Sequence, residues 1–123
     1  EYYNELTAQI FKLDLTDKII FIGFTDNPYI YMKFADCFVL PSRNEGLPNV
    51  VIESLFLGTP VAVTASVPVI RRIVRDGIDG FIVDVDDAEG LADAMVKSVN
   101  LGRVSSSYKS ATREDFEKLF LNI

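Results

Sequence analysis

The segment CFVLPSRNEGLPNVVIESLFLGTPVAVT, residues 37–64, contains two short apolar runs separated by a loop and a helix-like stretch. Its pattern predicts a strand over 37–40, a helix over 48–57 that stops at Gly58, and a second strand over 61–63. Strands that are apolar throughout and alternate with helices are typical of a parallel sheet with helices on both faces. The segment therefore predicts an α/β fold.

The alternation continues towards the N-terminus. Apolar residues at helical spacing predict a helix over about 3–13, and the apolar run 19–22 predicts a strand that ends at Gly23. Asn27 and Pro28 suit the N-cap and first positions of a helix that runs to about residue 35. The aromatic residues of that helix, Tyr29, Tyr31 and Phe34, are interpreted as core and rim.

The C-terminal part of the sequence also predicts alternating helices and strands. We expect a short helix over 69–74, a turn over 76–80 and a strand over 81–83. Asp86 and Glu89 resemble a capping box that starts a further helix. The apolar face of this helix is formed by Ala88, Leu91, Ala92, Met95, Val96 and Val99. A final helix carries Phe116, Leu119 and Phe120.

The composition of the chain limits the classes of function that it can have. A chain of 123 residues with 49% hydrophobic and 24% charged residues suits one globular domain. A net charge of -6 argues against nucleic acid as a partner, and the absence of His excludes His-dependent catalysis within this chain. The single Cys37 is interpreted as a small buried hydrophobe. No apolar run approaches the roughly 20 residues of a membrane-spanning helix, so we expect a cytoplasmic protein.

The loop 41–47 carries the most informative chemistry. In a parallel α/β sheet, ligands bind beyond the carboxyl ends of the strands, where a loop leads into a helix. With Pro48 at the first helical position, Leu47 becomes the N-cap, and Leu is a poor cap. The amides of Gly46, Leu47, Asn49 and Val50 are then available to an anion such as a diphosphate.

Two glutamates stand on either side of these amides. Glu53 lies on the helix, where its carboxylate can accept hydrogen bonds from vicinal hydroxyls such as those of a ribose. Glu45 lies before the helix, within reach of a sugar hydroxyl. The plainer interpretation is a carboxylate that balances the helix dipole and a second one that is simply solvated.

The stretch PSRNEGLPNVVIESLFLGTPV, with FIGF before it and DGIDGFIV after it, resembles the C-terminal half of GT-B glycosyltransferases of the large retaining family 4. The E-x7-E motif of that family corresponds to Glu45 and Glu53, and the resemblance covers roughly residues 5–100. It implies a Rossmann-like domain that binds a nucleotide-diphospho-sugar, with a UDP-sugar favoured, and that transfers a hexosyl group with retention and without a metal or other cofactor.

The resemblance also implies roles for single residues. Glu45 is the catalytic-site residue that contacts hydroxyls of the donor sugar, and Glu53 holds the ribose. The backbone from Gly46 through Leu47, Pro48 and Asn49 to Val50 surrounds the diphosphate. Residues Phe21, Gly23 and Phe24 lie near the base.

Two departures from the family pattern matter. The loop ASVPVIRRIV lacks the usual glycines, and Arg72 stands where a Glu is usual. We also expect residues 1–123 to be a partial C-terminal donor domain, without its first strands, its Gly-Arg and Lys pair, and the N-terminal domain that binds a glycan or lipid-linked acceptor. The isolated chain should then be inactive. Residues 19–24 should be separated from the strand at 37–40 by a two-strand gap.

Further expectations follow from the same resemblance. The full-length protein should act in bacterial polysaccharide biosynthesis, in the cytoplasm and peripheral to the inner membrane. Self-association is expected through the incomplete sheet or the C-terminal helix. Arg71, Arg72 and Arg75 form either a solvated helix face or a substitute phosphate clamp. A non-catalytic nucleotide-binding or interaction module is the alternative function, and a GT-B epimerase is disfavoured by the E-x7-E spacing.

Overall fold

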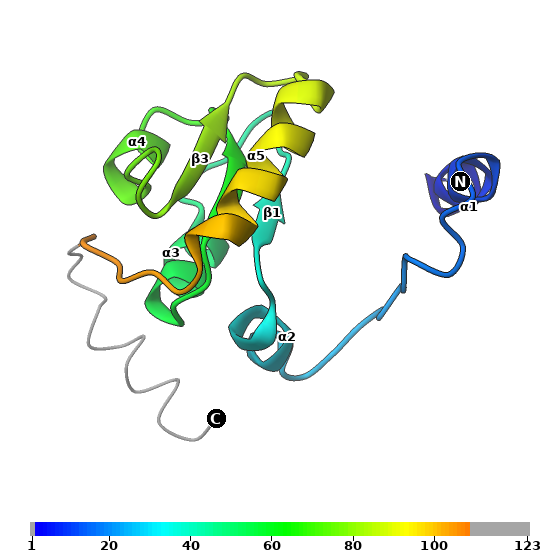
Figure 1. Ribbon diagram of the computed structural model, residues 1–123, viewed down its shortest axis with the longest axis horizontal. Coiled ribbons are helices and arrows are strands. Elements are labelled where there is room, and N and C mark those ends of the chain that lie inside the picture. Colours follow the sequence, from blue (N-terminus) through cyan, green and yellow to red (C-terminus); the bar gives the residue numbers. More distant parts are fainter. Residues whose placement is uncertain (1, 109–123) are drawn as a thin grey trace.

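The computed structural model describes residues 2–108, which form five helices and one small sheet (Figure 1). The elements in chain order are α1 (Tyr2–Lys12), α2 (Pro28–Phe34), β1 (Phe38–Leu40), α3 (Asn49–Phe56), β2 (Val61–Thr64), α4 (Ile70–Ile73), β3 (Gly80–Val83) and α5 (Ala88–Leu101). The predicted final helix with Phe116, Leu119 and Phe120 lies outside the described residues. No helix in the described part is long and apolar enough to cross a membrane.

The three strands form one parallel sheet in the order β1-β2-β3. Phe38 pairs with Val61 and Val61 pairs with Gly80, so β2 is the central strand. Helix α5 lies across one face of the sheet, whereas α3 and α4 contribute to the core on the other side (Figure 1). The predicted α/β class with a parallel sheet and flanking helices is confirmed.

The hydrophobic core is built on β2. Every residue of this strand is buried, because β1 and β3 flank it and helices cover it. The fully or almost fully buried cluster consists of Val51, Ile52, Leu55, Val61, Val63, Ile70, Ile73 and Val74. Helix α3 is therefore fixed by its own apolar side against the central strand, which determines where its N-terminus points.

The predicted strand over 19–22 does not form. These residues belong to an extended segment between α1 and α2, with Ile20 84% exposed and Phe21 50% exposed. In Figure 1 this segment carries α1 away from the sheet. A strand requires a hydrogen-bonded neighbour, and within the described residues β1 pairs with β2 alone. The free edge of β1 and the apolar run therefore remain apart.

Helix α5 differs from its prediction in both cap and face. The N-cap is Asp87, whose side chain accepts a 2.9 Å hydrogen bond from the Gly90 amide, and not Asp86. Its buried residues are Ala94 and Ser98. The predicted apolar face is largely exposed, with Met95 at 41%, Val96 at 64% and Val99 at 46%. Small residues at four-residue spacing let the helix approach the sheet closely, and this determines which face is buried.

Candidate donor-binding site

Helix α3 begins one residue later than the sequence predicts. Its N-cap is Pro48, not Leu47, and no side chain caps the helix. The buried Pro48 ring closes the loop against the core, and the Pro48 carbonyl accepts a 3.0 Å hydrogen bond from the Val51 amide. The Asn49 amide turns back to the Leu47 carbonyl at 2.9 Å. One of the predicted donors thus already has a partner in this structure.

Three of the predicted amide donors point to no acceptor. Among residues 2–108, the backbone N–H groups of Gly46, Leu47 and Val50 make no hydrogen bond to the protein. Gly46 and Leu47 are exposed, and a methyl group added to Gly46 would meet no atom within 4 Å. The start of α3 therefore offers directed donors and open space for a ligand.

Glu45 is held in place by the loop that carries it. The Ser42 hydroxyl donates a 2.8 Å hydrogen bond to Glu45 Oε1, and the buried Thr64 hydroxyl in turn donates to the Ser42 carbonyl. Glu45 is half-buried. Next to it, exposed Arg43 pairs with Asp86 at 2.7 Å, which joins this loop to the start of α5. The Glu45 carboxylate is thus positioned from the end of β2.

Glu53 lies about one turn inside α3 and is half-buried. Burial raises the pKa of Glu53, while the Tyr29 hydroxyl on α2 acts on this pKa in the opposite direction. Burial and the nearby carboxylate raise the pKa of Tyr29. The sequence interpretation missed this pair, because Tyr29 was assigned to the core and rim by its helical spacing.

The residues expected near the base lie on the extended segment before α2. Gly23, with φ +73°, lines a largely apolar cavity of about 330 Å³ together with Thr25, Pro28 and Phe38. Phe21 is 50% exposed and Phe24 is 93% exposed, and neither lines this cavity. Of the three residues, Gly23 is therefore the one that lines this cavity, whereas Phe21 lines a separate cavity of about 270 Å³ beside α1.

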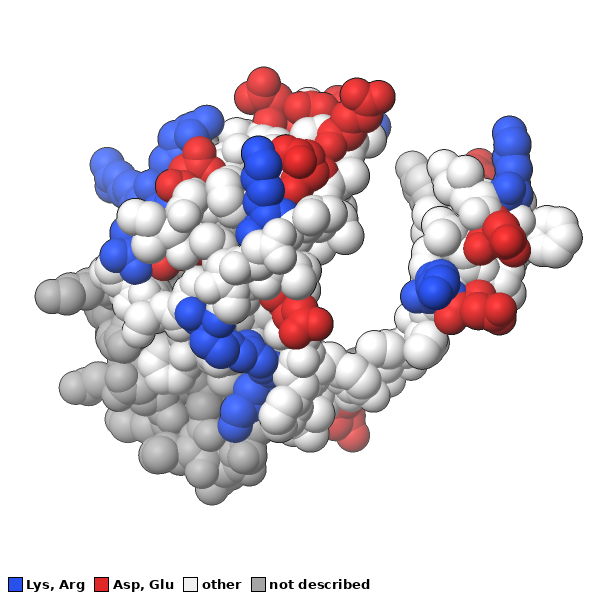
Figure 2. All heavy atoms as spheres, in the orientation of Figure 1, with Lys and Arg blue, Asp and Glu red and all other residues white. Residues whose placement is uncertain are grey.

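The arginine cluster divides into two parts. Lys and Arg side chains gather over α4, whereas Asp and Glu side chains gather at the start of α5 (Figure 2). Arg71 and Arg72 are exposed on α4, in agreement with a solvated helix face. Arg75 instead binds the fully buried Asp79 carboxylate through Nε at 2.9 Å and Nη2 at 2.8 Å. Arg75 therefore stabilises the turn before β3.

Metal ligation finds no support in the described side chains. In residues 2–108, no three His, Cys, Asp or Glu residues come together in an arrangement that could hold a metal ion. Cys37 is half-buried, and burial raises the pKa of its thiol, although Ser98 and the backbone of Ala62 partly counter the effect. The groups that lie in the loop after β1 and at the start of α3 are backbone amides, the Ser42 hydroxyl and the Glu45 carboxylate, and Glu53 follows about one turn inside α3.

Comparison with known proteins identifies several relatives. A transferase of Campylobacter jejuni, N-acetylgalactosamine-N,N'-diacetylbacillosaminyl-diphospho-undecaprenol 4-alpha-N-acetylgalactosaminyltransferase, is 31% identical over 110 residues, which are 89% of this chain and 30% of that protein. The lipopolysaccharide core biosynthesis glycosyltransferase LpsE of Rhizobium meliloti is 38% identical over 87 residues, or 71% of this chain and 25% of that protein. The chain thus spans less than a third of the length of these curated relatives.

A family model describes nearly the whole chain. It matches residues 1–115, which include the three strands, the loop 41–47 and both glutamates. The matched region therefore contains every residue of the candidate site, and the chain belongs to the family of glycosyl transferases group 1.

Proposed function

We propose that this domain binds a nucleotide-diphospho-sugar donor for retaining hexosyl transfer, as in GT-B glycosyltransferases of family 4. The observation that carries the proposal is the start of α3, where unpartnered amides lie between Glu45 and Glu53. Amides and a helix dipole suit a diphosphate, and carboxylates suit sugar hydroxyls. Both kinds of group occur in one nucleotide sugar.

In this proposal each group has one role. The amides of Gly46, Leu47 and Val50 bind the diphosphate, with hydrogen bonds to a charged group that contribute about 1.5–3 kcal/mol each. Glu53 accepts hydrogen bonds from the ribose diol. Glu45 contacts hydroxyls of the donor sugar and is held for this by the Ser42 hydroxyl.

The base would lie near the N-terminal end of α2. The apolar cavity beside this end is lined by Gly23, and the neighbouring Phe21 and Phe24 offer exposed aromatic faces that could stack on a base. A UDP-sugar is the donor that we favour. We therefore assign Phe21, Gly23 and Phe24 to base binding within this proposal.

The chemistry would rest on electrostatic stabilisation. The bond between the anomeric carbon and the diphosphate oxygen breaks, and the amides at α3 receive the negative charge that develops on the leaving diphosphate. The acceptor oxygen forms the new bond to the anomeric carbon on the same face and gives its proton to the leaving diphosphate oxygen, so the anomeric configuration is retained. No metal or other cofactor is needed for this step.

The acceptor would be a glycan or a lipid-linked saccharide. The names of two relatives support this class: that of the Campylobacter jejuni transferase includes a diphospho-undecaprenol, and a relative in Salmonella typhi is named as a Vi polysaccharide biosynthesis protein. We propose that the acceptor is held by a further domain, at the cytoplasmic side of the inner membrane. The 123-residue chain by itself should bind the donor without transferring sugar.

Calorimetric titration of UDP and GDP into the chain tests the proposal. Saturable binding is expected, with UMP weaker than UDP because it lacks the second phosphate. Glu53→Ala should weaken binding at least tenfold, since the ribose loses hydrogen bonds to a charged group. Glu89→Ala on α5 is the matched control, because it removes an equal charge from an exposed helical position.

Two results would contradict the proposal. The first is the absence of heat with either nucleotide from a chain whose circular dichroism shows that it is folded. The second is equal affinity of the Glu53→Ala variant and the wild type, since this would place the nucleotide elsewhere.

A further inference from the structure

A second cavity lies at the sheet edge where the candidate donor site is found. Its volume is about 330 Å³, at the lower end of the range for small-ligand pockets. The walls come from the loop after β1, the end of β2 and the start of α5. Ligands of parallel α/β sheets bind beyond the carboxyl ends of the strands, so the position of the cavity suits binding. The described residues that line it are Pro41, Arg43, Thr64, Asp86, Asp87, Ala88 and Leu91.

This cavity is separate from the amides at the start of α3. Helices α3 and α5 cover opposite faces of the sheet (Figure 1), and no described residue of α3 lines the cavity. The loop 41–47 joins the two places, because Thr64 in the cavity donates a hydrogen bond to the Ser42 carbonyl. Arg43 stands two residues before Glu45, a separation of at most about 7 Å along the chain. A ligand at Arg43 would therefore be a neighbour of a sugar at Glu45.

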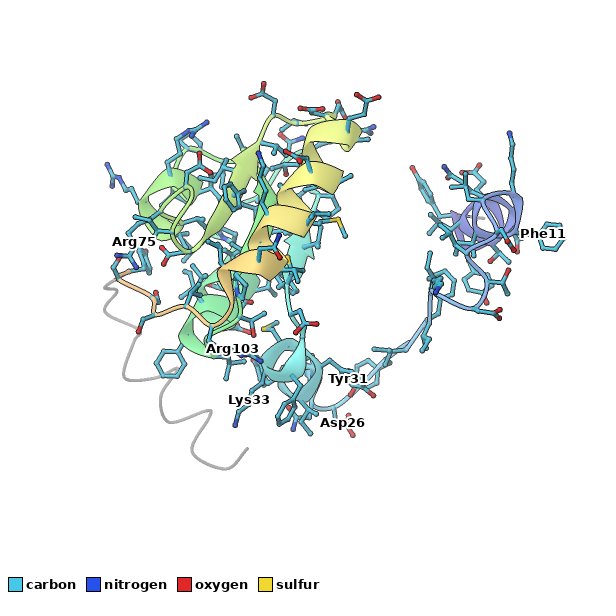
Figure 3. The ribbon with its side chains drawn as sticks, in the orientation of Figure 1. Phe11, Asp26, Tyr31, Lys33, Arg75 and Arg103 are labelled. Atoms are coloured by element: carbon cyan, nitrogen blue, oxygen red, sulfur yellow. The ribbon has the colours of Figure 1, made fainter. Side chains whose placement is uncertain are left out.

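The charged groups of the cavity do not suit a phosphate. Of the described residues that line it, Arg43 is the one that carries a positive charge, and its Nε already donates to Asp86 Oδ1 at 2.7 Å. Asp87 adds a second carboxylate, and Asp and Glu side chains gather at this start of α5 (Figure 2). Figure 3 places Arg75 and Arg103 towards the other end of the helix. One Arg and two Asp give the lining a net charge of -1, which disfavours an anion.

The same groups suit a neutral saccharide. A sugar hydroxyl can accept a hydrogen bond from a guanidinium and donate one to a carboxylate, so it can bridge Arg43 and Asp86. Their side chains are 76% and 64% exposed, and such exposed ion pairs are weak, so this pair can open for a ligand at little cost. The apolar part of the lining comes from Pro41, Ala88 and Leu91, and it can pack against the C–H face of a sugar ring.

We propose that this cavity is a subsite for the acceptor, in which the hydroxyls of a neutral sugar ring bind Arg43 and Asp86 and its C–H face packs on Pro41 and Leu91. The inference rests on the proposed donor binding, and it adds a place on this domain for the acceptor saccharide. The further domain then holds the remainder of the acceptor. The acceptor ring and the donor sugar lie on either side of the loop 41–47.

Chemical-shift mapping of the 123-residue chain tests the subsite. Glucose, galactose, N-acetylglucosamine, N-acetylgalactosamine and maltose are titrated to high millimolar concentration and followed by ¹H–¹⁵N NMR. At least one sugar should shift the Arg43 Nε–H and Leu91 amide resonances in a saturable manner. Inorganic phosphate at equal ionic strength should leave both resonances in place, because the lining carries a net negative charge.

Two variants locate the bound sugar through the Leu91 amide. Arg43→Met keeps the length of the side chain and removes its donors, so it should weaken binding of the sugar about tenfold. Asp86→Asn keeps one acceptor oxygen but loses the charge, and it should weaken binding about fivefold. Arg72→Met is the matched control, because it removes the same group from an exposed position on α4, outside the cavity. Circular dichroism verifies that each variant is folded.

The outcomes separate this inference from the donor proposal. If UDP binds and no sugar of the panel shifts these resonances, the subsite is overturned and donor binding stands. If a sugar binds at Arg43 but neither UDP nor GDP binds, donor binding fails and the acceptor role of the cavity fails with it. Equal sugar affinity of Arg43→Met and wild type would place the sugar elsewhere and overturn the subsite. A shift of the same resonances by phosphate would overturn the choice of a neutral ligand.

Discussion

Replacement of Thr59 by Val is expected to destabilise the domain although it preserves the shape of the side chain. Thr59 is fully buried just before β2. Its hydroxyl donates to the Met32 carbonyl at 2.7 Å and accepts from Arg103 Nη1 at 2.7 Å. Valine fills the same volume and can do neither, so the substitution isolates the contribution of the hydroxyl.

The size of the destabilisation depends on whether each hydrogen-bond partner of Thr59 can find a replacement after the hydroxyl is removed. The residue Met32 is 7% exposed, so the loss of the hydroxyl leaves its carbonyl buried without this donor, at a cost of about 1–3 kcal/mol. Arg103 is exposed, and water replaces its lost acceptor at little cost. We therefore expect a loss of about 2 kcal/mol in the free energy of unfolding. Thr59→Ser, which keeps the hydroxyl and deletes a buried methyl group, should cost only about 1 kcal/mol.

Urea unfolding followed by circular dichroism measures both variants. The midpoint should fall in the order wild type, Thr59→Ser, Thr59→Val, with similar slopes because the surface exposed on unfolding hardly changes. A serine variant less stable than the valine variant would refute the reasoning, since packing and not hydrogen bonding would then dominate at this position. A valine variant as stable as wild type would refute it as well.

Three further predictions concern other parts of the fold. Gly80→Ala should lower the free energy of unfolding by about 3 kcal/mol or more in a urea titration, because the new methyl group would clash with a backbone oxygen of β2. Gly77→Ala should lower it by only about 1–2 kcal/mol, because the methyl group meets open space and only the φ of +84° is unfavourable for alanine. Asp87→Ala should cost about 1 kcal/mol through the lost N-cap. Asp86→Asn, whose side chain tolerates the φ of +65° at this position, should cost less than about 0.5 kcal/mol because the ion pair that it removes is exposed; the reverse order would show that the cap is wrongly assigned. Burial raises the pKa of Glu53, so the folded state binds this proton more tightly than the unfolded chain and the ionised carboxylate lowers stability at neutral pH. Glu53→Gln should thus be more stable than wild type at pH 7.5, and this gain should shrink as the pH falls through the raised pKa; a gain that grows on acidification would contradict the argument.

The elements that the sequence predicts correctly are those with strong local signals. The helix over 28–35, the strand over 37–40 and the strand over 61–63 all appear within one or two residues of their predicted bounds. Each has a start signal or a preceding stop signal. Asn27 followed by Pro28 starts the helix, and Gly58, with φ +88°, ends α3 shortly before the strand over 61–63. The side chain of Asn27 makes no capping hydrogen bond, so the position was predicted correctly and the contact was not.

The predicted strand over 19–22 shows where local signals stop being sufficient. Its four apolar residues have high strand propensity, and a helix follows at the expected distance. Pairing, however, depends on a neighbouring edge, and no edge reaches these residues within the described part of the chain. The two-strand gap expected between this run and β1 assumes that the run is a strand, so it stays a prediction.

The exposed side of α5 illustrates a second limit. Larger apolar residues such as Met95 and Val96 give the stronger periodic signal, but the helix turns its small residues Ala94 and Ser98 to the sheet. The Ser98 hydroxyl donates a 2.9 Å hydrogen bond to the Val61 carbonyl, so close approach also satisfies a buried polar group. Periodicity locates a helix well, but close backbone approach determines its face.

The surroundings of the two glutamates were not predictable from the motif itself. Ser42 stands three residues before Glu45, a spacing that could have suggested the hydrogen bond between them. The influence of Tyr29 on the pKa of Glu53 links two helices and has no signal in the sequence beyond an aromatic residue in the first turn of α2.

The candidate site is organised from the two ends of β2. Thr59, just before the strand, holds α2, the helix whose Tyr29 influences the pKa of Glu53. Thr64, at the end of the strand, holds the Ser42 carbonyl in the loop whose hydroxyl orients Glu45. The elements around the two carboxylates are thus held by separate hydrogen bonds from residues five positions apart, one just before and one at the end of the most buried strand of the domain. Because these hydrogen bonds are separate, a substitution at one threonine should disturb the surroundings of one carboxylate and leave those of the other in place.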